Sequence, residues 1–234
     1  MTESAHGIIL RTRPLTETSL IVHWLTPDSG RIATVAKGAR RPKSPFAGKL
    51  DLFYEADFSF SRSRRSELHT LREASLRDTH GPIREDVHKL QQAGYAAAFL
   101  EQATETETPL PEIYGLVRAF LKHLCQSPPA PENIPALELQ FLRELGMEPG
   151  SEESRLSPGT MKILPTLAGG GWDAISQLKP SPAQIGELRQ YLHGFLIFHL
   201  GRLPRGRAAA LAAGQSGAAG LKKDSFVEKL VYAI

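Results

Sequence analysis

The chain has 234 residues, of which 41% are hydrophobic and 23% are charged, and its formal net charge is +3. These fractions are those of globular proteins, so they exclude a chain that is disordered throughout, and the length suits one large or two small domains. The sequence has no apolar run of about 18 residues and only one cysteine, Cys125, which excludes an internal disulfide and a thiolate-rich metal site. We expect a reduced, cytoplasmic protein without membrane contact, cofactor or metal.

Charge is distributed unevenly along the chain. Residues 1–82 carry 13 Lys and Arg against 9 Asp and Glu, residues 83–154 carry 5 against 12, and residues 155–234 carry 10 against 4. This asymmetry predicts that the two ends of the chain meet an anion and that the middle does not.

The first 80 residues have the pattern of short strands. Five alternating or β-rich runs are separated by turn residues, at 7–13, 19–25, 31–37, 52–60 and 67–76. Five strands without an intervening helix fit a small closed barrel of the OB type. We expect Tyr54, Phe58 and Phe60 in its interior.

From residue 81 onward the apolar residues follow a helical period. The pattern predicts helices over 83–105, 111–126, 132–146 and 181–204, and a glycine- and proline-rich loop over 148–173. The fold class is therefore α+β with two domains. We expect a five-stranded OB-fold barrel over 1–80, an all-helical domain over 81–211, and a linker with a short terminal helix of unknown role over 212–234.

The stretch Ala36–Leu50 is basic, rich in turn residues and free of acids. Backbone amides and cationic side chains in such a loop can follow a sugar-phosphate backbone without reading bases. The candidate nucleic-acid-binding cations lie on this loop, on the outward face of the first strand and at the end of the last long helix: Lys37, Arg40, Arg41, Lys43, Lys49, Arg11, Arg13, Arg202, Arg205 and Arg207. The alternative is an ordinary solvated charged surface.

Aromatic side chains beside the cations would let single strands stack their bases. Phe46 is the main candidate because it lies in the basic loop, next to a proline. Phe53 is another candidate. Trp24 shares a strand face with Leu20 and Val22, which favours the core.

The sequence does not indicate an enzyme. It has no phosphate-binding P-loop, dinucleotide-binding glycine motif or nucleophile elbow, and its eight histidines are scattered. The acidic middle could border a helical groove that receives another protein, although a solvated helix surface is the simpler interpretation. A protein-interaction scaffold and an RNA-binding OB-fold protein therefore stay open as alternatives.

Several stretches resemble RecO, the bacterial recombination-mediator and DNA-repair family. They are "RTRPLTETSLIV" and "LTPDSGRIATVAKGARRPKS" in the first part, and "LRQYLHGFLIFHLGRLPRGR" later. The likeness covers residues 7–80 well and 181–207 moderately. It implies an OB-fold followed by a helical domain, and a non-enzymatic protein that binds single- and double-stranded DNA and anneals complementary strands. It also implies work with RecR and the single-stranded-DNA-binding protein in loading RecA.

The resemblance places Lys37, Arg40, Arg41 and Lys43 in the loop through which the family is thought to contact DNA. One departure concerns zinc. Many members form a zinc finger from two Cys-x-x-Cys pairs in the helical domain, whereas residues 147–172 contain no cysteine here. Zinc is therefore not expected.

Overall fold

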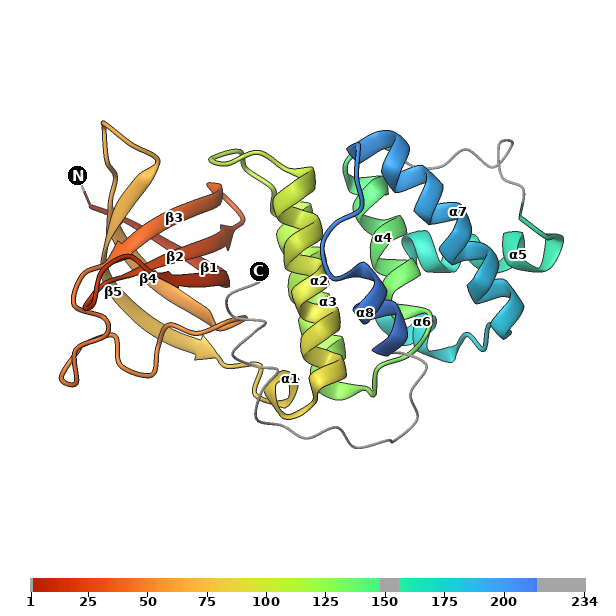
Figure 1. Cartoon of the computed structure of the whole chain (residues 1–234), viewed down its shortest axis with the longest axis horizontal. Helices are drawn as coiled ribbons and strands as arrows, with labels where there is room; N and C mark the ends of the chain where they lie inside the picture. Colours follow the sequence, from red (N-terminus) through yellow and green to blue (C-terminus); the bar gives the residue numbers. More distant parts are fainter. Residues whose placement is uncertain (1, 148–155, 214–234) are drawn as a thin grey trace. The chain divides into compact units, whose positions relative to one another are not determined.

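The computed structural model describes residues 2–147 and 156–213 (Figure 1). These residues form two compact units. The first unit contains residues 2–81 together with 104–121, and the second contains residues 82–103, 122–147 and 156–213. Residues 104–121 thus belong with the first unit, beyond the 1–80 that we expected for the barrel domain.

The first unit is built on a closed five-stranded barrel in the order β1-β2-β3-β5-β4, with β4 returning to β1. All strand pairs are antiparallel except β3 with β5. The strands are β1 (Thr2–Pro14), β2 (Leu20–Thr26), β3 (Gly30–Ala36), β4 (Glu55–Ser61) and β5 (Leu68–Asp78). This architecture confirms the predicted OB-type barrel.

Alternating side chains of the strands fill the barrel interior. Trp24 is fully buried, its ring stacks on Phe58 with 4.0 Å between centroids, and its indole N–H donates to Thr34 Oγ1 at 2.8 Å. Phe60 is buried in the same cluster and Tyr54 packs against it. The predictions for Trp24, Phe58 and Phe60 are therefore confirmed, whereas Tyr54 is only partly buried at the edge of the cluster.

The segment 104–110 lies along the hairpin between β2 and β3. Arg31 donates through Nε to Thr104 Oγ1 at 2.8 Å, and the Leu110 amide donates to the Pro27 carbonyl at 3.2 Å. Gly30 has a φ of +61°, and a Cβ built on it would lie 1.7 Å from the Thr108 carbonyl oxygen. Only glycine permits this close approach.

Helices make up the second unit, and α3 is shared between the two units. The helices are α1 (Pro82–Glu85), α2 (Val87–Ala103), α3 (Pro111–Gln126), α4 (Asn133–Glu144), α5 (Pro158–Gly169), α6 (Trp172–Gln177), α7 (Pro182–Leu200) and α8 (Arg207–Ala213). None of these described helices is long and apolar enough to cross a membrane. Residues 148–155 and 214–234, including most of the expected linker and terminal helix, lie outside the described part.

The predicted loop over 148–173 is wrong in its later part, because α5 and the start of α6 occupy it. Ser157 caps α5 by accepting from the Thr160 amide, and Pro158 takes the first helical position. Thr160 and Leu167 are fully buried. The prolines and glycines of this segment suggested a loop. In the structure Pro158 begins α5 and Gly169 ends it, and tertiary packing stabilises the helix.

Candidate nucleic-acid interface

Three strand ends meet at one end of the barrel. The strand register pairs Pro14 of β1 with Leu20 of β2, and pairs Leu20 with Ala36 of β3. The turn between β1 and β2 therefore lies beside the start of the basic loop that follows β3. Arg13 and Lys37, which directly adjoin these paired residues in the chain, come to the same end of the barrel.

Arg40 joins the turn to the loop. Its amide donates to the Thr18 carbonyl at 3.0 Å, and its Nη1 donates to the Thr16 carbonyl at 3.1 Å. The turn is closed by the Leu15 amide, which donates to the Ser19 carbonyl at 2.9 Å. Arg40 thus has a structural role as well as an exposed charge.

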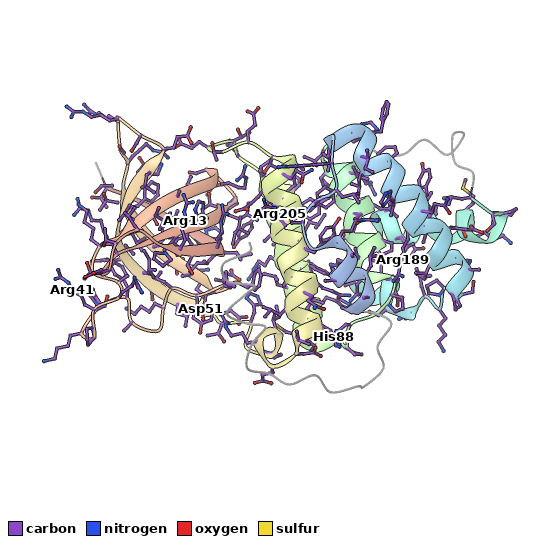
Figure 2. The ribbon with its side chains drawn as sticks, viewed as in Figure 1. Arg13, Arg41, Asp51, His88, Arg189 and Arg205 are labelled. Carbon is purple, nitrogen blue, oxygen red and sulfur yellow. The ribbon has the colours of Figure 1, made fainter. Side chains whose placement is uncertain are left out.

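We define the basic rim as the five exposed cations at this end of the barrel: Arg13, Lys37, Arg40, Arg41 and Lys43. Figure 2 labels Arg13 on the barrel and Arg41 on the loop that follows β3. Residues 37–49 contain no acid. The neighbouring turn between β1 and β2 carries one exposed acid, Glu17, so the five cations leave the rim with a net positive charge suited to phosphates.

The rim loop is held by consecutive turns and by one buried anchor. The Arg41 amide donates to the Gly38 carbonyl and the Ser44 amide donates to the Arg41 carbonyl, both at 3.1 Å. Phe46 follows and belongs to the barrel core. Because its anchor is buried, the loop can hold its cations outward without a regular helix or strand.

Positive charge continues from the rim onto the outer face of the barrel. Arg11 is half-buried and lies opposite His23 in the ladder between β1 and β2. Burial, followed by the positive charges of Arg11, Arg13 and Arg31, lowers the pKa of His23 to about 4. His23 is therefore neutral at physiological pH, mainly because it is buried and in smaller part because of the cations around it.

The predicted aromatic platform is wrong. Phe46 is 7% exposed, Phe53 is 2% exposed and Trp24 is fully buried. Phe46 was expected to have little to bury it, but its ring packs in the hydrophobic cluster of the barrel. Trp24 and Phe53 are closed to bases, and Phe46 exposes only a small part of its ring, at the wall of a cavity.

Lys49, at the end of the rim loop, has surroundings that differ from those of the five rim cations. It is half-buried and lines a cavity of about 630 Å³ whose walls also include Asp28, Asp57 and Glu73. Arg72 lines the same cavity, and Asp57 is paired with Arg77 at 2.6 Å, so the charges around Lys49 are mixed. A DNA contact by Lys49 stays a prediction.

The three C-terminal candidates belong to the second unit and differ from one another. Arg202 and Arg205 are exposed between α7 and α8 (Arg205 is labelled in Figure 2). Arg207 is only 6% exposed and donates to both carboxylate oxygens of Glu138, through Nε at 2.6 Å and Nη2 at 2.9 Å. A DNA-binding role for Arg207 is therefore a wrong prediction, because its guanidinium is committed to an interior ion pair.

Residues 61–66, between β4 and β5, have a polar sequence that predicts only a turn. In the structure Arg64 and Arg65 are exposed on it. The neighbouring Arg62 is instead tied to Glu3 and Glu107, with 2.9 Å ion pairs to each. OB-folds use two loops to bind oligonucleotides, and the turn between β4 and β5 corresponds to one of them. The predicted strands were therefore enough to mark Arg64 and Arg65 as candidate binding residues.

Within the described ranges, no group of three or more His, Cys, Asp and Glu side chains is placed to hold a metal ion. The sequence contains a single cysteine, Cys125, so it cannot supply the four thiolates of a Cys₄ zinc site.

Comparisons with known proteins give the family. Residues 1–80 match the family model described as "Recombination protein O N terminal", and residues 84–154 match "Recombination protein O C terminal". The DNA repair protein RecO of Anaeromyxobacter sp. (strain K) is 28% identical over 230 residues, covering 84% of this chain and 91% of the relative. The DNA repair protein RecO of Rhodopirellula baltica is 32% identical over 146 residues, covering 62% of this chain and 54% of the relative. The chain belongs to the RecO family of DNA repair proteins.

Proposed function

We propose that this chain is a non-enzymatic DNA-binding protein of recombinational repair. It binds single- and double-stranded DNA, anneals complementary strands, and works in the cytoplasm with RecR and the single-stranded-DNA-binding protein to load RecA. Its membership of the RecO family supports the repair role, and the partners follow from the resemblance to that family. The observation that carries DNA binding is the basic rim on the barrel, whose loop after β3 contains no acid.

The chemistry of the rim favours contacts with phosphates over contacts with bases. Arg41 and Lys43 are long, exposed and cationic, and neither belongs to a helix or strand that would enter a DNA groove. Binding of this kind releases counterions, depends steeply on salt and is nearly independent of sequence. When the rim neutralises the phosphates of a strand, repulsion between complementary strands falls, which promotes annealing.

The test is the salt dependence of binding to labelled oligo-dT, measured by fluorescence anisotropy. The variant carries Lys37→Ala, Arg41→Ala and Lys43→Ala, and Arg40 is left in place because it holds the turn. The slope of log K against log salt should fall in magnitude by about 0.7 for each lost phosphate contact, or about 2 for all three.

A matched control removes the same charge elsewhere. Lys122, Lys162 and Lys179 are exposed lysines of the second unit. Their combined replacement by alanine should leave the slope nearly unchanged. Equal slopes for the rim variant and the unmodified protein would contradict the proposal, and tighter binding of a matched RNA strand would favour an RNA-binding protein instead. The same variants should rank in the same order in strand-annealing rate.

A further inference from the structure

Leu15 is an apolar side chain exposed within the basic rim. It is 45% exposed and lies in the turn between β1 and β2, two residues after Arg13. Among the described residues, the exposed large apolar side chains are Leu15, Leu76, Ile197 and Phe198. Of these four, only Leu15 lies at the rim.

The turn holds Leu15 in a defined position. Thr16 Oγ1 accepts from the amides of Thr18 at 3.3 Å and Ser19 at 3.1 Å, and the Leu15 amide donates to the Ser19 carbonyl. Arg40 then ties the same turn to the rim loop through two hydrogen bonds. Single exposed leucines are common on protein surfaces. This one is distinguished because a cation of the rim itself fixes the turn that presents it.

Apart from Leu15, the apolar residues that the rim exposes include prolines, since Pro14, Pro42 and Pro45 are all exposed. Trp24, Phe46 and Phe53, which could have stacked on bases, are buried. Aliphatic side chains can contact base faces, since leucine and proline are among the apolar wedges that architectural proteins insert between base steps of duplex DNA. With an unpaired base, the same contact needs no unstacking of a base pair. Pro14 and Leu15 are both exposed and adjacent in the chain.

The geometry points to Leu15, supported by Pro14, as the base-contacting element of the rim, with unpaired nucleobases of single-stranded DNA as its ligand. This inference rests on the proposed function and adds to it a division of labour. The cations hold the phosphates, and the turn covers one face of a base that is free of its partner. Bases inside an intact duplex are already stacked, so the contact favours single strands over double strands.

The test compares Leu15→Ser with Leu76→Ser. Leu76 is 37% exposed on β5, so the control removes a similar apolar side chain from the same barrel. Leu15→Ser should weaken oligo-dT binding about fivefold, the lower end of the effect of removing a stacking partner. Its salt slope should stay unchanged because no phosphate contact is lost. Leu76→Ser should leave both quantities unchanged, and binding to duplex DNA should be nearly unchanged in both variants.

A second pair of variants gives a direct signal of base contact. Leu15→Trp should bind oligo-dT more tightly, and its added fluorescence should be quenched by the bases. The added fluorescence of Leu76→Trp should not respond.

Three results distinguish failure of the inference from failure of the proposed function. If Leu15→Ser binds normally and Leu15→Trp is not quenched while the unmodified protein binds DNA, this inference is overturned and the proposed function stands. If Leu15→Ser lowers the salt slope together with the affinity, the side chain supports the turn and does not contact bases, which also overturns it. If the unmodified protein fails to bind oligo-dT at low salt, both fail.

Discussion

The ion pair between Arg207 and Glu138 is the feature of the second unit whose removal we expect to have the largest effect. Glu138 is fully buried, and one of its oxygens accepts from Tyr95 Oη at 2.5 Å as well as from Arg207 Nε. Burial, together with the Glu138 carboxylate, raises the pKa of Tyr95 well above its ordinary value, so its hydroxyl remains a donor at neutral pH. Replacing Arg207 by alanine would leave the carboxylate inside the protein without its cation.

Removing one member of a buried ion pair typically costs about 3–5 kcal/mol. Stabilities of single domains are about 5–15 kcal/mol, so Arg207→Ala should remove a large fraction of the stability of this unit. Tyr95→Phe removes one hydrogen bond to a charged group and should cost less, about 1.5–3 kcal/mol. Replacing both charges, with Arg207→Met and Glu138→Leu, should recover most of the loss because no unpaired charge remains.

Denaturant unfolding followed by tryptophan fluorescence can assign the loss to one unit. Trp172 stacks on His123 in the second unit, with 4.8 Å between ring centroids, and Trp24 lies in the barrel core. A Trp24→Phe background therefore reports the second unit, and a Trp172→Phe background reports the barrel. Arg207→Ala should shift the transition of the second unit to lower denaturant concentration. It should leave the transition of the barrel nearly unchanged.

The same variant tests whether Arg207 contacts DNA. Oligo-dT affinity of Arg207→Ala, measured where both units are folded, should equal that of the unmodified protein. An unchanged unfolding transition together with weakened DNA binding would refute the reasoning, because it would mean that Arg207 acts on DNA and not in the interior.

Three further predictions concern the barrel unit. Gly30→Ala should lower the unfolding midpoint by more than Gly48→Ala, because an added Cβ at Gly30 also meets the Thr108 carbonyl. Gly48→Ala has only the cost of a left-handed backbone, about 1–2 kcal/mol. Equal midpoints for the two variants would contradict this prediction. Phe46→Leu should keep oligo-dT affinity while destabilising the barrel modestly, and lost affinity in a folded variant would restore a stacking role. His23 should titrate near pH 4 by NMR. Because an unfolded histidine titrates near 6.5, stability should fall as pH drops from about 6.5 to 4, and His23→Gln should remove the part of that loss due to His23, leaving the parts due to His69 and His123, whose pKa values burial also lowers. Bound DNA should raise the pKa of His23, and an unchanged value at saturation would argue against phosphates near it.

The sequence pattern predicted correctly those features that depend on residues close together in the chain. The five strands lie close to their predicted positions, and α3 spans the predicted 111–126. The alternation of Phe58 and Phe60 with polar neighbours followed from the two-residue period of a strand whose one face is buried. The acid-free composition of residues 37–49 was visible without any structure.

Prediction failed where burial depends on residues far apart in the chain. α5 was missed because its buried face is defined by packing, and its proline and glycine residues look like those of a loop. The candidate site was affected in the same way, since Phe46 and Arg207 were assigned to the surface by their neighbours in sequence alone.

The sequence alone was enough to predict which segments are strands and which are helices, the barrel class and the position of the cationic loop. These features depend on residues a few positions apart. Only the tertiary structure decided which members of the candidate site face solvent. Arg207 pairs with a carboxylate 69 residues away, and Arg40 is fixed by a carbonyl 24 residues away. Exposure of a side chain is set by such long-range contacts, which composition and spacing do not specify.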